Sequence, residues 1–187
     1  MEEWNRLDKF IALLRYKKLM SFIPDRMDTI CDIGCGKDGR FLKSISERIS
    51  KGYALDRKIE NHTEQNIEFI KVMDIQQGLP LEDESVDVIC MIAVLEHLDE
   101  PEAIFCEAYR VLKSKGKFIL TSPSKMAKPI LEFMAFKLKI ISANEIKDHK
   151  YYYCKTEVNE LFKKNKFTNM RFKWFQFGMN QIFIGEK

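Results

Sequence analysis

The chain is organised around residues 29–39, where a short β-prone run ends in a turn that holds three glycines. An amphipathic helix pattern follows at once, with apolar residues at Phe41, Leu42, Ile45 and Ile49. Because glycine has no Cβ atom, such a turn can be tight and lets a ligand approach the backbone closely. The following helix directs unpaired N–H groups toward that ligand. Strand, glycine turn and helix together predict a nucleotide-type cofactor site in an α/β fold.

Two cofactor classes fit this stretch. Gly34, Gly36 and Gly39 satisfy G-x-G-x-x-G, the dinucleotide fingerprint, which is a weak signal by itself. Asp32 stands two residues before the first glycine, where a carboxylate suits a ligand with an ammonium group and would repel a pyrophosphate. The stretch therefore resembles D/E-x-G-x-G, the first motif of the class I S-adenosylmethionine-dependent methyltransferases. A strand, turn and helix with a merely structural role is the alternative.

Two further acids follow strands. Asp56 ends a short strand 22 positions after Gly34, and Asp74 follows the alternating strand 67–72. The resemblance implies that Asp56 binds the ribose hydroxyls, that Asp74 lies beside the adenine amino group, and that Ile75 packs on the ring. Each acid could instead serve a local turn. The cofactor-binding set implied by the resemblance is Asp32, Gly34, Cys35, Gly36, Asp56, Arg57, Asp74, Ile75 and Ala93.

The most apolar strand is predicted at residues 85–92, and it runs into Val94-Leu95-Glu96-His97-Leu98. This run is closely similar to V-L-E-H-L in the small-molecule methyltransferases often called type 11. Ligands of open α/β sheets bind outside the carboxyl ends of the strands, so Glu96 and His97 stand where chemistry is expected. Of the three histidines, His97 and His149 are predicted near the pocket as candidates for a general base. Either could instead be structural.

Residues 124–155 form an insertion that less specifically resembles sugar and glycan-precursor methyltransferases. Because it follows the fifth strand, we expect a roof over the acceptor pocket, with Tyr152 and Tyr153 joining Glu96 as substrate-binding residues. An ordinary packing helix or a lipid-facing surface are the alternatives. Residues 123–187 carry 13 Lys/Arg against 6 Asp/Glu, which favours an acidic acceptor as much as a solvated lysine face.

Length and element order predict one domain over residues 1–187. An N-terminal helix lies within 1–24, with Trp4 on its apolar face, and it either packs on the domain or closes over the cofactor. The resemblance implies a Rossmann-like, doubly wound, seven-stranded sheet of order 3-2-1-4-5-7-6, whose last strand is antiparallel. Near the C-terminus, Thr156 is predicted to cap a helix, and Asn165 to take the left-handed turn after it.

Composition excludes several classes. Five cysteines, an odd number with no C-x-x-C pair, fit neither a disulfide framework nor a zinc site, and no metal is predicted. A reduced, cytoplasmic protein is expected. The sequence has no long apolar run, so neither a signal peptide nor a transmembrane span is predicted. The absence of an N-P-P-Y or D-P-P-Y run lowers the case for a nucleic-acid partner. The oligomeric state is not predicted.

The predicted function is methyl transfer from S-adenosylmethionine to a small acceptor, with O-methylation of a sugar, a glycan precursor or another acidic metabolite favoured. An NAD-dependent oxidoreductase is the first alternative, and only the third glycine, Gly39, favours it. The chain also contains the pair Tyr109-x-x-x-Lys113, which has the spacing of short-chain dehydrogenase catalytic pairs. That pair is read as coincidence, because it lies far from the carboxyl ends of the predicted strands. A non-catalytic partner subunit with the same fold is the second alternative.

Overall fold

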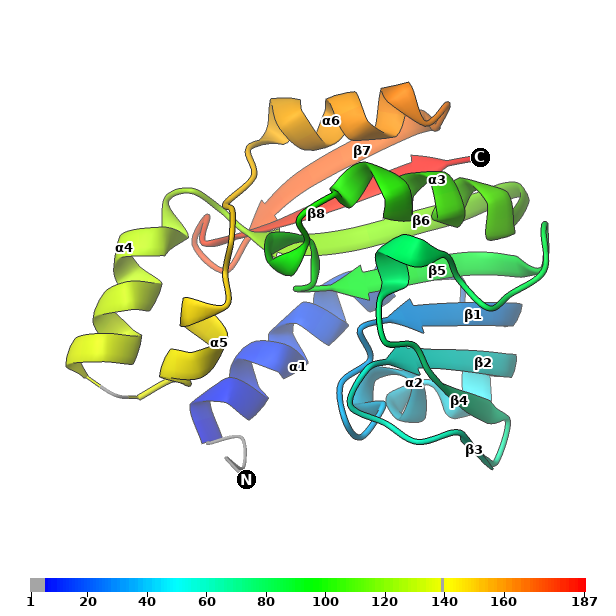
Figure 1. Ribbon diagram of the computed structural model, residues 1–187, viewed down its shortest axis with the longest axis horizontal. Coiled ribbons are helices and arrows are strands. Elements are labelled where there is room, and N and C mark those ends of the chain that lie inside the picture. Colours follow the sequence, from blue (N-terminus) through cyan, green and yellow to red (C-terminus); the bar gives the residue numbers. More distant parts are fainter. Residues whose placement is uncertain (1–5, 139) are drawn as a thin grey trace.

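The computed structural model describes residues 6–138 and 140–187, and its centre is one sheet of eight strands (Figure 1). The strands cross the sheet in the order β3-β4-β2-β1-β5-β6-β8-β7. The five adjacent strands β4, β2, β1, β5 and β6 pair in parallel, whereas β8 is antiparallel to both β6 and β7. The bounds are β1 (Met27–Ile33), β2 (Ile49–Asp56), β3 (His62–Glu64), β4 (Ile67–Lys71), β5 (Val86–Ile92), β6 (Leu112–Pro123), β7 (Thr168–Phe175) and β8 (Asn180–Glu186).

Seven of these strands keep the predicted order 3-2-1-4-5-7-6, so the prediction of a Rossmann-like fold is confirmed. The eighth strand, β3, was not predicted. It pairs antiparallel with β4 at the sheet edge, through a turn in which Gln65 has a φ of 55°. All three residues of β3 are exposed, so the sequence shows none of the apolar alternation from which a strand is predicted.

Helices cover both faces of the sheet (Figure 1). On one face, α3 and α6 pack in a core that includes Phe105, Val158 and Phe162. On the other face, α1 and α2 contribute Leu19 and Phe41 to a second core. The helices are α1 (Arg6–Met20), α2 (Arg40–Ser44), α3 (Pro101–Val111), α4 (Ala127–Glu132), α5 (Ala143–Lys147) and α6 (Lys155–Lys164), with short helical turns η1 (Ser46–Arg48), η2 (Ile75–Gln77), η3 (Leu95–His97) and η4 (Phe133–Lys137).

The predicted N-terminal helix is α1, although its first predicted residues, Trp4 among them, lie outside the described part of the chain. Pro101 begins α3, because its fixed φ suits the first helical turn and its missing N–H is one that no helix uses there. Within residues 6–138 and 140–187, no helix combines the length and the apolar character needed to cross a bilayer.

Four phenylalanine rings join α3, α6 and β6 into one core. Phe105 and Phe162 meet edge to face with ring centroids 4.9 Å apart, and Phe118 and Phe167 complete the group. Gly185 on β8 belongs to the same packing, since a Cβ atom added there would lie 2.5 Å from the Phe162 ring. Edge-to-face pairs favour this arrangement beyond the burial of their surface.

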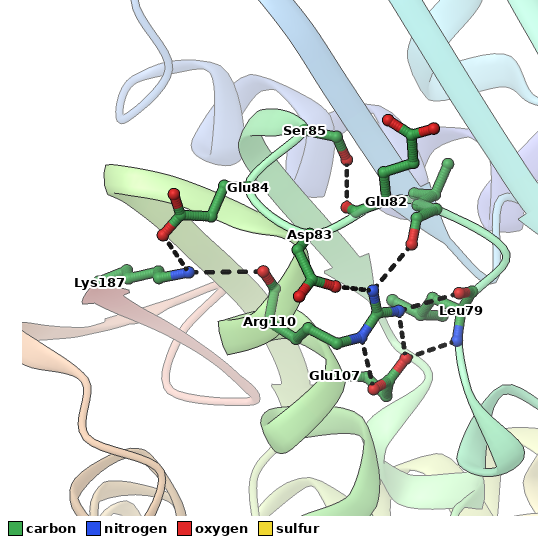
Figure 2. A network of polar contacts seen from close by, with 9 residues as sticks. Leu79, Glu82, Asp83, Glu84, Ser85, Glu107, Arg110 and Lys187 are labelled. Atoms are coloured by element: carbon green, nitrogen blue, oxygen red, sulfur yellow. Dashed lines mark hydrogen bonds and ion pairs between the residues drawn. The ribbon is translucent and has the colours of Figure 1, made fainter.

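Arg110 fixes the loop that leads into β5 (Figure 2). Its guanidinium group donates to Glu107 at 2.7 and 2.9 Å and to Asp83 at 2.6 Å. It also donates to the backbone carbonyl groups of Leu79 and Leu81. The Arg110 charge thus holds the amino end of the central strand β5, the end opposite to that at which ligands of this fold class bind.

The helical insertion predicted after the fifth strand is confirmed as α4, η4 and α5. Figure 1 shows it beyond the ends of β5 and β6, beside α1. α4 passes without interruption into the π-helical turn η4, and such turns are frequent at functional sites. The insertion keeps large apolar side chains exposed, among them Ile130, Phe133 and Phe136.

Both ends of α6 differ from the prediction. The N-cap is Cys154 rather than Thr156, and its backbone N–H donates to the Glu157 carboxylate at 2.6 Å in a capping box. At the other end Asn165 has a φ of −95°, and Lys166 takes the left-handed conformation with a φ of 65°. The Asn165 amide instead donates to the Leu161 carbonyl, which satisfies one of the last carbonyl groups of the helix.

The aromatic core predicts an unequal response to two phenylalanine substitutions. Phe162→Ala should lower the free energy of unfolding by about 3–5 kcal/mol, because it leaves a cavity among three other rings. Phe177→Ala, at a fully exposed position, should change it by less than about 0.5 kcal/mol. Urea unfolding followed by circular dichroism measures both. Similar losses for the two variants would contradict the assignment of this core.

Candidate active site

The glycine turn lies at the carboxyl end of β1, and its first two glycines differ in what surrounds them. Gly34 has a φ of 74°, and an added Cβ atom would lie 2.3 Å from Val94 Cγ2. Gly36 has a φ of 70°, but an added Cβ atom would meet nothing within 4 Å. The backbone at Gly34 is thus packed against the segment after β5, whereas the backbone at Gly36 faces open space where a ligand can approach.

The third glycine has a packing role. Gly39 precedes α2 with a φ of 58°, and an added Cβ atom would lie 2.5 Å from the Phe69 ring. The G-x-G-x-x-G match that favoured a dinucleotide is therefore explained by contact between α2 and β4. Cys35, between the first two glycines, is half-buried, and its backbone N–H donates to the Leu55 carbonyl at 3.1 Å.

Asp32 is buried, with 2% of its surface exposed, and its Oδ1 atom has no hydrogen-bond partner within the described residues. Burial and the charge of Asp56 raise the pKa of Asp32 well above its ordinary value. An unpartnered buried carboxylate is costly, and a cationic ligand group beside it would offset that cost. The residue therefore fits the ammonium-bearing ligand that the sequence predicted.

Asp56 ties the end of β2 to the glycine turn. Its Oδ2 accepts from the backbone N–H of Gly36 at 2.8 Å, and its Oδ1 accepts from that of Lys58 at 2.8 Å. The adjacent Arg57 is exposed. The structure thus brings Asp56 to the open side of the glycine turn, and its predicted contact with a ribose stays a prediction.

Asp74 caps the turn η2. Its carboxylate accepts from the Gln76 backbone N–H at 3.0 Å and from the Gln77 side chain at 3.1 Å. Those hydrogen bonds, with the Gln76 backbone first, lower the pKa of Asp74. The local turn role named as the alternative is thus present in the structure. Ile75 is half-buried against the core.

Ala93 directly follows β5 and has a φ of 55°, a conformation that costs energy for any residue with a Cβ atom. Its backbone N–H donates to the Thr121 carbonyl at 3.0 Å. Backbone strain of this kind gathers at ligand sites, where surrounding contacts hold it in place. Here it turns the chain from β5 into η3, which carries Glu96 and His97.

Glu96, His97 and His149 form one cluster. One ligand atom from each lies within 4.8 Å of the others, and the two imidazole ring centroids are 4.9 Å apart, edge to face. Glu96 is 1% exposed, and its Oε1 lies 4.0 Å from His149 Nε2. The backbone holds the cluster together, because the Lys150 N–H donates to the Glu96 carbonyl at 2.8 Å. The structure thus brings the two predicted histidines together.

The two predicted tyrosines are placed differently. The Tyr152 hydroxyl lies 2.8 Å from His149 Nδ1 and belongs to the cluster. Tyr153 is 8% exposed, lies in the hydrophobic core, and meets the Tyr151 ring edge to face. Tyr153 therefore packs in the core, and its predicted contact with a substrate stays a prediction.

Burial dominates the electrostatics of the cluster. It raises the pKa of Glu96 to about 7 and lowers that of His149 to about 4, and it also lowers the pKa of His97. The charge of Arg15 on α1 lowers the pKa of both Glu96 and His149. At neutral pH both imidazoles are therefore neutral and able to accept a proton or a ligand through a nitrogen lone pair.

Two residues of α1 that act on the site were not predicted from the sequence. One is Arg15; the other is Tyr16, whose pKa is raised to about 12 by burial and then by the Asp32 charge. α1 also joins the rest of the fold through Gln176, which donates to the Ile11 carbonyl at 3.1 Å. A local helix pattern does not reveal which side chains reach a strand end far along the chain, so no signal identified them.

Two surface clefts lie away from these residues. One, of about 300 Å³, is bordered by Phe22, Lys117 and Arg171. The other, of about 560 Å³, is bordered by the first residues of β1 and β2 and by Asp87. The second cleft is at the amino ends of the parallel strands, the edge opposite to the glycine turn.

Fold, glycine turn and strand-end acids together define the class of this chain. They are those of the class I S-adenosylmethionine-dependent methyltransferases, and the resemblance found in the sequence is confirmed. The cofactor of this class is S-adenosylmethionine. The residues present fit it, since Asp32 offers an unpartnered buried carboxylate and Gly36 an open backbone surface.

Comparison with known proteins agrees with this class. Residues 31–120 match the family model described as a methyltransferase domain. The chain is 28% identical over 151 residues to the demethylmenaquinone methyltransferase of Lactobacillus johnsonii, covering 71% of this chain and 59% of that protein. It is 30% identical over 101 residues to a protein of Mycolicibacterium smegmatis named as a probable S-adenosylmethionine-dependent methyltransferase. That match covers 52% of this chain and 38% of that protein.

Among solved structures, a Thermotoga maritima protein described as a methyltransferase of this cofactor, possible histamine N-methyltransferase, superposes with a TM-score of 0.71. It is 20% identical, with 96% of this chain and 90% of that chain covered, so the likeness concerns the fold alone. The chain spans 38 to 59% of the length of the three curated relatives it matches.

The open backbone at Gly36 predicts a loss of cofactor affinity that is separable from stability. Gly36→Ala and Gly178→Ala both place a Cβ atom at a left-handed φ, so each should lower the free energy of unfolding by about 1–2 kcal/mol. Only Gly36→Ala should weaken S-adenosylmethionine binding, by at least about tenfold, measured by calorimetry. Equal affinity in the two variants would show that the cofactor does not approach Gly36.

The raised pKa of Glu96 predicts a pH-dependent stability in the ligand-free protein. The folded-state pKa of Glu96, about 7, exceeds the ordinary 4.5. The contribution of Glu96 to the free energy of unfolding is therefore full below pH 4.5 and is lost as the pH rises through 7. Glu96→Gln removes this loss. Relative to wild type, its free energy of unfolding should therefore increase by about 2 kcal/mol between pH 5 and pH 7.5. Urea unfolding at both pH values tests this, with the exposed Glu82→Gln as a control that should show no such increase.

Proposed function

We propose that this chain transfers the methyl group of S-adenosylmethionine to an oxygen atom of a small acceptor that is acidic or sugar-linked. The observation that carries the proposal is the position of buried Asp32 and the Gly36 backbone beside the segment that holds Glu96 and His97. Gly34 abuts Val94, so the cofactor side and the titratable cluster adjoin. A donor and an acceptor held there would be neighbours, as group transfer requires.

When bound, S-adenosylmethionine supplies an activated methyl group on a sulfonium. The task left to the chain is to hold and orient both reactants and to exclude water. Asp32 would meet the cationic end of the cofactor, and Asp56 would accept hydrogen bonds beside the glycine turn. The segment formed by α4, η4 and α5 would cover the acceptor.

A hydroxyl acceptor must lose a proton during methyl transfer, and His97 is our candidate for the group that receives it. The ring is half-buried, so an acceptor can reach it, and its Nδ1 is 3.0 Å from the Asp148 carbonyl oxygen. A carbonyl only accepts hydrogen bonds, so Nδ1 carries the hydrogen and Nε2 carries the lone pair. His149 is the second candidate, although burial lowers its pKa to about 4 and makes it the weaker base.

Fewer lysines of the insertion are available to attract an acidic acceptor than the sequence count suggests. Lys125 pairs with Glu157 and Lys150 with Asp99, so these lysines are partly neutralised within the chain. The charges of Arg57 and Lys58 both reach His97 and lower its pKa. An acidic acceptor beside His97 would therefore meet cationic side chains from the end of β2 and not only from the insertion.

Two alternatives are less well supported. An NAD-dependent oxidoreductase would place a pyrophosphate beside the Asp32 carboxylate, which repels it. A non-catalytic partner subunit would have no use for Asp32 and Glu96, whose buried oxygens lack partners within the described residues and cost stability. Such costs persist where a site binds a ligand.

The proposal includes a cytoplasmic location and a small-molecule acceptor in place of a nucleic acid. The five cysteines are all free thiols, which suits a reducing compartment. The demethylmenaquinone methyltransferase among the relatives acts, by its name, on a small molecule.

His97→Ala should lower the rate of methyl transfer by about 10²–10⁴-fold while leaving S-adenosylmethionine affinity unchanged, because it removes a proton acceptor and not a cofactor contact. The assay follows radiolabelled methyl groups from the cofactor into a small-molecule cell extract, with calorimetry for binding. His62→Ala, on the remote strand β3, is the matched control and should keep the wild-type rate. An unchanged rate in His97→Ala would remove the residue from the mechanism, and failure of wild type to bind the cofactor would overturn the function.

A further inference from the structure

The cluster of Glu96, His97 and His149 has features that proton transfer alone does not require. Its three side chains come from two distant segments, η3 and the loop after α5, and one ligand atom from each lies within 4.8 Å of the others. The Glu96 Oε2 atom is buried and has no hydrogen-bond partner within the described residues. A buried carboxylate oxygen left without a donor indicates that something outside the chain satisfies it.

Each imidazole of the cluster is oriented through its Nδ1 atom. His97 Nδ1 donates to the Asp148 carbonyl oxygen at 3.0 Å, which leaves a lone pair on Nε2. His149 Nδ1 lies 2.8 Å from the Tyr152 hydroxyl oxygen, so Nε2 is the nitrogen of this ring that is left to bind a ligand. A hydrogen bond from one ring nitrogen to an oxygen, with the other nitrogen free to coordinate, is typical of histidines that ligate metals.

We propose that Glu96, His97 and His149 bind one divalent first-row transition-metal ion, such as Zn²⁺, Co²⁺ or Fe²⁺, through one carboxylate oxygen and two imidazole nitrogens. Imidazole nitrogen favours these ions, whereas Mg²⁺ and Ca²⁺ favour all-oxygen sites. Two histidines with one carboxylate form a ligand set that leaves coordination positions open.

The distances in the metal-free protein are compatible with this assignment. His149 Nε2 and Glu96 Oε1 are 4.0 Å apart. Ligand bonds of about 2.0–2.2 Å at tetrahedral angles bring two ligand atoms to roughly 3.3–3.5 Å. A shift of less than about 1 Å closes this pair on the ion, and His97 and His149 are both only half-buried, which leaves a route for it.

The consequence for catalysis rests on the proposed function. An ion with open positions can take the acceptor oxygen as a ligand and lower the pKa of its hydroxyl group, so that the proton passes to solvent before the oxygen accepts the methyl group. When the ion is bound, His97 and His149 act as its ligands, and the role of proton acceptor that we propose for His97 in the metal-free protein passes to solvent. Binding of the ion by itself requires neither the cofactor nor the acceptor.

The test uses the full chain, freed of metal with a chelator and then dialysed, in the absence of cofactor and acceptor. Co²⁺ is titrated in and followed by its visible absorption, and Zn²⁺ is titrated by calorimetry. We expect one Co²⁺ per chain, with a visible band that indicates nitrogen and oxygen ligands. His97→Ala, His149→Ala and Glu96→Gln should each weaken binding by at least about 10²-fold, and Tyr152→Phe by about tenfold, as loss of an orienting hydrogen bond does.

Two controls separate this site from adventitious binding. His62→Ala removes the remaining histidine of the chain, on exposed β3, and Cys106→Ser removes an exposed thiol on α3; both should bind Co²⁺ like wild type. Glu96→Gln keeps the side-chain shape, and circular dichroism verifies that each variant is folded. For folded variants, thermal unfolding gives a second readout, because only a protein that binds the ion is stabilised by it.

Several outcomes would overturn the proposal. One is that wild type binds neither Co²⁺ nor Zn²⁺. Another is that wild type and a folded His97→Ala, His149→Ala double variant bind Co²⁺ equally well. Methyl transfer that persists at full rate in excess chelator would remove the ion from catalysis and leave the proposed function standing. Conversely, a chain that binds Co²⁺ through these residues but not S-adenosylmethionine would keep the metal site and overturn the methyltransferase function.

Discussion

The parallel pairing of β1 with β2 and β5 is the constraint on which the rest of the site depends. It sets Asp32 opposite Ala54 on one side and Cys90 on the other, so the three strands end at one edge of the sheet. The glycine turn, Asp56 and the segment that carries Glu96 therefore emerge side by side. Gly34 can follow β1 only because it lacks a Cβ atom where Val94 packs.

The same arrangement places two unpartnered carboxylate oxygens, on Asp32 and Glu96, in the interior. Each costs stability in the ligand-free chain, since a charged group is removed from water without a donor. The aromatic core around Phe105 and Phe162 lies on one face of the sheet and supplies stability through burial. The strained backbone at Ala93 follows the carboxyl end of β5, and the π-helical turn η4 lies in the insertion after β6; both are features that are frequent at functional sites.

Local patterns predicted much of the fold because strands, helices and glycine turns repeat with short periods. They failed where a particular hydrogen bond or strand pairing, which residue type alone does not reveal, decided the outcome. β3 forms because the edge of β4 is available for pairing, not because its exposed residues favour a strand. Cys154 begins α6 because Glu157 reaches back to its backbone N–H, and Lys166 takes the left-handed turn because the Asn165 amide is engaged with Leu161.

The sequence by itself determined the class of protein, since the strand, the glycine turn and the acids after successive strands are short-range features tied to a parallel sheet. It also marked His97 and His149 as the histidines near the pocket. Only the tertiary structure decided that Glu96 is buried in one cluster with both of them and that Arg15 acts on the same cluster. The physical reason is that these contacts join segments more than 50 residues apart, through the Lys150 N–H on the Glu96 carbonyl and through packing of α1, and no local periodicity encodes such a meeting.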